Sequence, residues 1–271
     1  LSSKNHHVVC DFFNESTSQR FVDLYGTMQV VVAQNSFAHV PDPLGYLTAL
    51  KKIINPNGLF FIQTSQADMV LNNEFDTIYH EHVNFYNINS MNELCRRAGY
   101  SLVDVVKTPI HGTSYVFVLS PQAGRPRRIE NFLEFERTAG LMSVDTYARW
   151  AERVQFNVGQ FWNICDVFKN QQKYMLVGYG AAAKGNTLLN FAGVKLDMII
   201  DDNPLKQGMY SPGTHIPVVG IDALDKINYN QPIMFVPLAW NFYREIKEKI
   251  LARRTVDRDR FLKYFPEVWV E

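Results

Sequence analysis

Residues 76–86, with the sequence DTIYHEHVNFY, concentrate side chains that can move protons. In an extended segment His80 and His82 share one face, while Tyr79 and Glu81 share the other. Histidine titrates near neutral pH and can take a proton from a moderately acidic C–H group, and a tyrosine can donate to the oxyanion that forms. Three interpretations stay open: acid/base chemistry, a metal site, and a polar strand end without chemistry.

The metal interpretation needs ligands from elsewhere in the chain. A His-x-His pair begins a zinc site only if a third ligand comes from a distant segment. His39 or His111 could serve, yet no sequence spacing supports either one. The cysteines lie far apart and form no CxxC motif; they are Cys10, Cys95 and Cys165. We therefore expect no metal, three buried reduced thiols and a cytoplasmic protein.

A glycine-rich stretch at residues 177–186, VGYGAAAKGN, is a second place where chemistry could occur. Gly178 and Gly180 end a predicted strand, and backbone amides at such a turn and at the following helix N-terminus favour a phosphate. Asp201 follows where a ribose-binding acid sits in a dinucleotide fold, but the third glycine, Gly185, falls two places late. A nucleotide phosphate, NAD(P) and a purely structural turn all remain open.

The first half of the chain predicts an α/β sheet. Residues 28–34 read as a strand buried on both faces, residues 41–54 as a helix, residues 55–58 as a turn and residues 59–64 as another buried strand. Strand, helix, turn and strand in this order indicate parallel pairing. Residues 101–109 and 114–120 read as the last two strands of this sheet.

A short helix is expected over residues 90–100, ahead of those last strands. Ser90 and Glu93 have capping-box spacing, and Gly99 suits the C-cap. The polar segment 121–128 then marks a candidate boundary.

The second half begins with a long amphipathic helix and continues as another α/β pattern. Apolar residues recur at helical steps, which predicts a bracing helix of about 25 residues; they are Trp150, Val154, Val158, Phe161, Cys165 and Phe168. Strand, glycine turn, helix and strand follow from residue 173, and residues 232–240 and 241–254 read as a strand and a helix. We expect a domain over 1–120, a linker with bracing helices over 121–170, and a Rossmann-like domain over 171–271.

Composition excludes several classes of protein. Lys+Arg and Asp+Glu are equal at 27 each, so no global basic charge favours nucleic acid. Apolar residues make up 46% of the chain, as in a globular protein. No run approaches the roughly 18 apolar residues of a membrane helix. A local phosphate pocket remains possible, and the oligomeric state stays open.

Longer motifs carry a family resemblance. The stretches CDFFNE, NSFAHVPD, NEFDTIYHEHVNFY, IHGTSYVFV and GYGAAAKGNTLLNFAGV, together with IDDNPLKQGMYSPGTHIPVV, resemble the sugar C-methyltransferases. These enzymes use S-adenosylmethionine to methylate a carbon next to the ketone of nucleotide-linked 4-keto-deoxysugars. The resemblance covers residues 8 to about 240. It implies part of a Rossmann-type methyltransferase domain followed by a Rossmann-like domain that helps to hold the sugar nucleotide.

The resemblance also implies roles for individual residues. His82 would be the base that removes the proton alpha to the ketone, Tyr79 and His39 would stabilise the enolate oxygen, and Glu81 would position a neighbouring imidazole. Two further sets are implied. Contacts to the methyl donor are expected at Asn35, Ser36 and Phe37. Contacts to the sugar nucleotide are expected at His111, Ser114, Gly180, Lys184, Asn186, Lys206 and His215.

The resemblance places a zinc-binding domain, a glycine-rich donor loop and a ribose-binding acid ahead of CDFFNE, and this sequence has none of them. We therefore expect the C-terminal part of a sugar C-methyltransferase. The alternatives are a non-catalytic descendant that binds sugar nucleotides and, from the glycine stretch with Asp201, an NAD(P)-dependent oxidoreductase.

Overall fold

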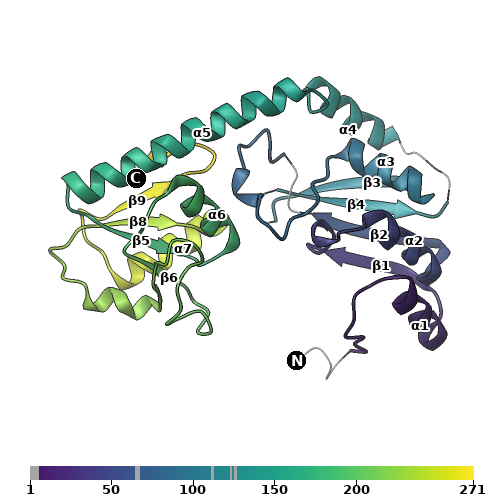
Figure 1. Cartoon of the computed structure of the whole chain (residues 1–271), viewed down its shortest axis with the longest axis horizontal. Helices are drawn as coiled ribbons and strands as arrows, with labels where there is room; N and C mark the ends of the chain where they lie inside the picture. The colour runs from purple at the N-terminus through teal and green to yellow at the C-terminus, as the bar shows by residue number, and fades with distance from the viewer. Residues whose placement is uncertain (1–5, 65–67, 111–112, 123, 125–126) are drawn as a thin grey trace. The chain divides into compact units, whose positions relative to one another are not determined.

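The chain divides into two compact units. The structure, a computed structural model, describes residues 6–64, 68–110, 113–122, 124 and 127–271. Residues 1–67 and 81–142 form the first unit, and residues 68–80 and 143–271 form the second. Each unit has its own sheet and its own hydrophobic core (Figure 1). The compact units divide at residue 142, whereas the functional boundaries at 120 and 170 stay a prediction.

The described strands of the first unit form a four-stranded sheet in the order β1–β2–β4–β3. They are β1 (Met28–Gln34), β2 (Ile54–Thr64), β3 (Ser101–Thr108) and β4 (Ser114–Ser120). β1 and β2 pair in parallel, and β4 is antiparallel to both of its neighbours. The helices are α1 (Glu15–Tyr25), α2 (Pro43–Ile53), α3 (Ile88–Ala98) and α4 (Arg127–Thr138), with a short turn η2 (Phe37–His39) after β1. The predicted strands and the parallel first pair are confirmed.

The start of α3 differs from the sequence prediction. Asn87 is the N-cap and accepts the backbone N–H of Ser90 at 2.8 Å, while the Ser90 hydroxyl accepts the backbone N–H of Asn87 at 3.0 Å. The capping box of Ser90 and Glu93 was therefore wrong by one turn, because Asn caps as well as Ser and the helix begins earlier. The C-cap at Gly99 is confirmed, with a left-handed φ of 69°.

The turn predicted at residues 55–58 lies inside strand β2. Met28 pairs with Ile54, and Val30 already pairs with Leu59, so the four intervening residues bulge out of the ladder. Asparagine, proline and glycine therefore produce an irregular start to the strand here, and not a break before it.

Strand β1 is covered on one face only. Val31 and Ala33 pack into the core with Phe60 and Ile62 of β2. Val30 and Val32 point to the opposite face and are 57% and 56% exposed. The prediction of a strand buried on both faces was wrong, because β1 is an outer strand of the described sheet and its second face stays open.

The second unit has a six-stranded sheet in the order β10–β9–β8–β5–β6–β7. The strands are β5 (Met175–Tyr179), β6 (Met198–Ile200), β7 (Val218–Val219), β8 (Ile233–Pro237), β9 (Arg260–Lys263) and β10 (Trp269–Val270). Apart from β10, the described pairings are parallel, as predicted for a Rossmann-like domain. The chain leaves β5 to one side for β6 and later reaches β8 on the other, so a topological switch point lies between β5 and β8.

Helical segments complete the second unit. They are η3 (Phe75–Thr77), α5 (Val144–Asp166), the π-turn η4 (Val167–Gln171), α6 (Ala183–Ala192), η5 (Ile221–Lys226), η6 (Trp240–Phe242) and α7 (Tyr243–Arg253). The predicted apolar stripe of α5 is confirmed, because its positions 154, 158, 161 and 165 are buried. That this helix braces two domains stays a prediction.

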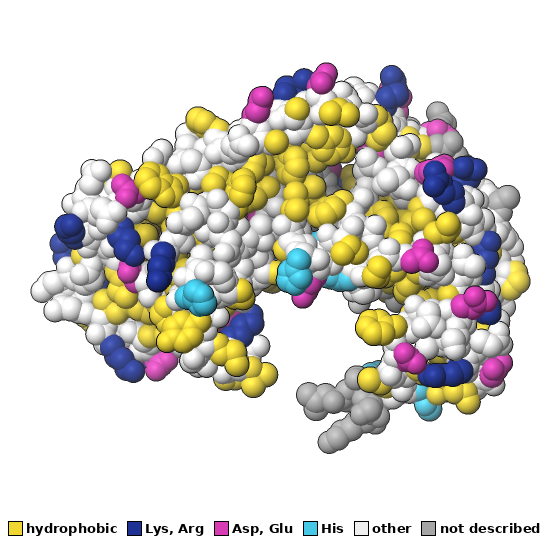
Figure 2. Space-filling view, in the orientation of Figure 1, with side chains coloured by type: hydrophobic (Ala, Val, Ile, Leu, Met, Phe, Trp, Pro, Cys, Tyr) yellow, Lys and Arg dark blue, Asp and Glu magenta, His cyan; other side chains and the backbone are white. Residues whose placement is uncertain are grey.

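Surface composition adds two observations. Basic and acidic side chains are interspersed over the face seen in Figure 2. Within the described ranges, no helix has the length and apolar character that crossing a membrane would need. Cys10 is exposed, so the prediction of three buried thiols was wrong for this one, which precedes α1 and lies outside the cores.

Candidate active site

Two histidines from distant parts of the sequence meet in the first unit. His39 ends the turn η2 after β1, and His82 follows 43 residues later. Their ring centroids lie 4.9 Å apart, and His82 is only 8% exposed. The ring of Phe85 lies edge-on to His82, with centroids 6.2 Å apart. A nearly buried imidazole beside a second imidazole is an arrangement that can take and hold a proton.

Backbone hydrogen bonds fix the segment that carries His82. The N–H groups of Val83 and Asn84 both donate to the carbonyl oxygen of Ala38, each at 3.1 Å. The side-chain amide of Asn84 donates to the carbonyl oxygen of Val40. These bonds tie the residues after His82 to the turn that carries His39, so both rings are positioned by the main chain.

The tautomer of His39 follows from its partner. Its Nδ1 lies 2.8 Å from the backbone carbonyl oxygen of Glu81, which can only accept, so Nδ1 carries a hydrogen. In the neutral ring Nε2 is then the acceptor. This contact to His39 is made by the main chain of Glu81, whose side chain is exposed, and the expected role of Glu81 in positioning an imidazole stays a prediction. Tyr79 belongs to the second unit, and its place beside His82 stays a prediction.

Polar groups collect at the carboxyl ends of β1 and β2. Asn35 has a left-handed φ of 50°, which is uncommon for a residue other than glycine, and its N–H donates to the Gln63 carbonyl oxygen at 3.0 Å. Three buried side-chain atoms here have no hydrogen-bond partner: Asn35 Oδ1, Gln63 Nε2 and Thr64 Oγ1. Buried polar groups without partners are rare, and a bound polar ligand is one way to satisfy them.

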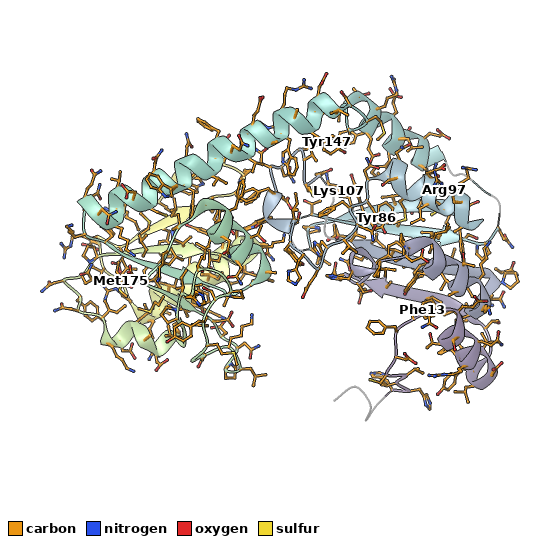
Figure 3. All side chains as sticks on the ribbon, in the orientation of Figure 1. Phe13, Tyr86, Arg97, Lys107, Tyr147 and Met175 are labelled. Atoms are coloured by element: carbon orange, nitrogen blue, oxygen red, sulfur yellow. The ribbon has the colours of Figure 1, made fainter. Side chains whose placement is uncertain are left out.

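A groove of about 1100 Å³ begins beside these strand ends and includes Ser36 and His39 in its lining. Its walls come from residues 11–15, which lead into α1, and from residues 40–42, 44–46, 48 and 49 of α2 and the segment before it. Phe37, also expected at the methyl donor, is fully buried and packs on Tyr86, which Figure 3 labels in the core. Only the backbone of Phe37 is therefore available for the predicted contact.

The glycine turn of the second unit binds a carboxylate of its own chain. Gly180 has a φ of +94°, which favours glycine, and the next N–H, that of Ala181, donates to Asp201 at 2.7 Å. Asp201 also accepts from the N–H of Asn203 at 2.8 Å, and Lys206 bonds the Ala181 carbonyl oxygen at 2.7 Å. The Asp201 carboxylate thus closes the turn, and the expectation that it holds a ribose stays a prediction.

Comparison with known proteins identifies the family of the chain. A family model described as C-methyltransferase C-terminal domain matches residues 109–266, and one described as methyltransferase domain matches residues 3–105. The chain belongs to the C-methyltransferase family. It is 30% identical over 245 residues to the C-methyltransferase NovU of Streptomyces niveus, and the match covers 86% of this chain and 56% of NovU. The chain thus spans a little more than half the length of that relative.

The other positions expected to bind sugar nucleotide in this C-methyltransferase chain lie in different settings. The Ser114 side chain is buried and its hydroxyl donates to the Ile110 carbonyl oxygen at 2.7 Å, while His215 is exposed with a left-handed φ of 52°. Asn186 lies in the first turn of α6, and its buried Oδ1 has no partner. His111 lies outside the described residues. Ligand contacts at all of these positions stay predictions.

The sequence analysis missed a buried polar cluster at the switch point between β5 and β8. Asp76 is fully buried and accepts the indole N–H of Trp240 at 2.8 Å. The Lys184 ammonium lies 4.8 Å from the centroid of the Trp240 ring, and its charge acts on both Asp76 and Glu74. Burial raises the pKa of Glu74 to about 7 and also raises the pKa of Asp76. The signal in the sequence was NEFD, two acids flanking a phenylalanine.

Gln63 and Thr64 were also missed. They end the apolar run LFFIQT, and polar residues at the carboxyl end of a buried parallel strand are typical of ligand sites in α/β sheets. In the described part of the chain, no three His, Cys, Asp or Glu side chains gather as metal ligands would.

Proposed function

We propose that this chain is the C-terminal part of an S-adenosylmethionine-dependent C-methyltransferase that acts on the carbon alpha to the ketone of a nucleotide-linked 4-keto-deoxysugar. The observation that carries the proposal is the pairing of His39 and His82. It lies in the first unit, next to a groove and to three buried polar atoms without partners at the ends of two parallel strands. Family membership supports the transfer of a methyl group to carbon.

The histidine pair suggests the order of the proton steps. His82 takes the α-proton on a ring nitrogen, the C–H electron pair forms the C=C bond, and the carbonyl oxygen becomes the enolate oxygen. His39 holds its Nδ1–H on the Glu81 carbonyl, so it can donate to this oxygen from Nε2 only as an imidazolium. A cationic donor is also the stronger one for an oxyanion, and Tyr79 is the proposed second donor.

The residues at the strand ends fit the donor molecule. When bound, S-adenosylmethionine supplies a methyl group on a sulfonium, which the enolate carbon attacks. Asn35, Gln63 and Thr64 have polar atoms to offer to its amino-acid and ribose groups, and Ser36 lines the adjoining groove. Because His82 is nearly buried, bulk water would be kept away from the enolate next to it, which would protect the enolate from reprotonation.

The oxidoreductase alternative loses its support from the sequence. It rested on the glycine stretch together with Asp201 as the ribose-binding acid, and that carboxylate makes hydrogen bonds within its own turn. The sugar nucleotide is proposed to use the second unit, near the β5–β8 switch point, where open α/β sheets bind ligands. A descendant that binds sugar nucleotide without catalysis is left as an outcome for experiment.

The proposal is tested by proton exchange, a step that does not require the methyl donor. The chain is incubated in D₂O with dTDP-4-keto-6-deoxyglucose, and NMR follows deuterium entering the carbon alpha to the ketone. We expect His82→Ala to slow this exchange by at least about 100-fold, the usual contribution of a positioned base. His80→Ala, at an exposed histidine two residues earlier, is the matched control and should exchange like wild type. Equal rates for His82→Ala and wild type would remove His82 as the base.

Calorimetric titration separates the remaining alternatives. Binding of both S-adenosylmethionine and the dTDP-sugar supports the methyltransferase. Binding of the sugar nucleotide alone, without proton exchange, would support the non-catalytic binding module. Binding of NADH alone would support the NAD(P)-dependent oxidoreductase.

A further inference from the structure

The segment that leads into Tyr79 is part of the second unit, although it is separated from the rest of that unit by more than 60 residues of sequence. Its turn η3 packs against α6. Phe75 is 8% exposed, with its ring centroid 5.6 Å from that of Phe191 and 6.4 Å from that of Phe265. This apolar contact explains why the segment docks, but it does not explain the buried charges beside it.

Asp76 is at the centre of the polar contacts in this cluster. Its Oδ2 accepts the Trp240 indole N–H at 2.8 Å, and its Oδ1 is buried without a partner. The Tyr264 hydroxyl donates to the Leu238 carbonyl oxygen at 2.8 Å and also interacts with the Asp76 carboxylate. An ionisable group buried at this depth is costly unless it is held by specific donors. An apolar residue would dock η3 at a smaller cost in desolvation.

Short-range hydrogen bonds stiffen the backbone between this anchor and Tyr79. The N–H of Ile78 donates to the Phe75 carbonyl oxygen at 2.9 Å, and the N–H of Tyr79 donates to the Thr77 carbonyl oxygen at 3.2 Å. A fixed Asp76 side chain therefore fixes the direction in which the chain leaves η3. The same anchor lies at the carboxyl ends of β5 and β8, because Trp240 lies three residues after the end of β8 and Lys184 lies in the first turn of α6.

We propose that Asp76, held by the Trp240 indole N–H, is a positioning residue that fixes the backbone leading from η3 to Tyr79. The catalytic part of this inference rests on the proposed function, whereas the anchoring part does not. The Lys184 ammonium lies over the Trp240 ring in the same cluster, and the sugar-nucleotide contact expected of Lys184 stays a prediction.

Trp240→Phe is the most selective test, because it removes the indole N–H but keeps an aromatic ring to stack on Phe265, whose centroid lies 4.8 Å away. Hydrogen–deuterium exchange of the backbone amides of residues 75–79 reads the anchor directly. We expect these amides to exchange about 10- to 100-fold faster, because the substitution leaves the Asp76 carboxyl buried without its indole donor. Trp162→Phe, at a half-exposed tryptophan of α5, is the matched control and should leave them unchanged.

The positioning role is read from α-proton exchange with saturating dTDP-4-keto-6-deoxyglucose. With the sugar nucleotide at saturation, Trp240→Phe should slow this exchange about 10-fold, since a misplaced group lowers the rate of the step in which it takes part. Asp76→Ala should have the same effect. The double variant should be no slower than the single ones, because both remove one interaction.

Each outcome decides the inference. Unchanged amide exchange in Trp240→Phe would overturn the anchor, whatever the activity. Faster amide exchange with an unchanged α-proton rate would overturn the positioning role and leave a structural contact. If the two substitutions slow α-proton exchange additively in the double variant, Asp76 and Trp240 do not act through one interaction, and the proposed anchor is overturned. If wild type itself shows no α-proton exchange, the proposed function fails, and amide exchange alone still decides the anchor.

Discussion

Replacing Glu74 by glutamine should change how the stability of the second unit depends on pH. Glu74 is 2% exposed, and its Oε1 accepts the Asn72 side-chain amide at 3.1 Å, while Oε2 has no partner. Burial raises the pKa of this carboxyl from 4.5 to about 7; the Asn72 bond and the Lys184 charge lower it, and Asp76 and Asp68 raise it. Glutamine keeps the shape and the acceptor but cannot ionise.

The direction of this pH effect follows from whether the folded or the unfolded chain binds the Glu74 proton more tightly. The folded chain holds the Glu74 proton to higher pH than the unfolded chain, so the stability from this group is fully present below pH 4.5. It is lost as the pH rises through about 7. Each pH unit between the pKa of 4.5 and the raised pKa of about 7 corresponds to about 1.4 kcal/mol. Full ionisation of Glu74 therefore lowers the free energy of unfolding by about 3 kcal/mol. Most of it falls between pH 5 and pH 8, and the raised pKa of Asp76 acts in the same direction.

Tryptophan fluorescence isolates the unit concerned, because all four tryptophans, Trp150, Trp162, Trp240 and Trp269, lie in it. Between pH 5 and pH 8, the free energy of unfolding in urea should fall by about 2 to 3 kcal/mol more in wild type than in Glu74→Gln. This difference corresponds to roughly 1 M in the urea midpoint. Glu152→Gln, at an exposed position on α5, should behave like wild type. A wild-type loss within about 0.5 kcal/mol of the loss in Glu74→Gln would refute the reasoning.

Two further predictions concern packing. Gly185→Ala should destabilise the second unit by about 1 to 3 kcal/mol in the same fluorescence assay, because a Cβ there would lie 2.6 Å from Leu238 Cβ; Gly159→Ala, with open space around it, should stabilise by up to about 1 kcal/mol. Ile62→Ala should cost the first unit about 2 to 5 kcal/mol, whereas Val32→Ala, on the open sheet face, should cost under about 1 kcal/mol, both measured by circular dichroism. Equal costs within either pair would contradict the packing described.

The late third glycine of the fingerprint shows how far sequence spacing can be interpreted. Its displacement departs from a standard dinucleotide turn. In the structure Gly185 lets α6 approach Leu238 at the end of β8, so its role is close packing of helix on strand. The sequence placed this glycine at the start of a helix. The neighbour that leaves no room for a side chain there, Leu238, lies more than 50 residues away in the sequence.

Local patterns determined the secondary structure and the candidate residues. Valine-rich runs, glycine turns and the 3.6-residue stripe of α5 identified the strands and helices, because they depend on neighbours close in sequence. The YHEH motif located the acid/base candidates, because a base and an oxyanion donor require those residue types. Helix α3 was misplaced at its start only because two side chains within one turn could both serve as the cap.

Only the tertiary structure decided what each candidate touches. It brought His39 to His82 through carbonyl contacts made by Ala38 and Val40, turned Asp201 inward to close the glycine turn, and buried Asp76 against Trp240. These contacts join segments between about 20 and 164 residues apart, and their formation depends on sheet order and packing. A sequence specifies which groups can donate, accept or ionise, but burial and distance decide which of them do so.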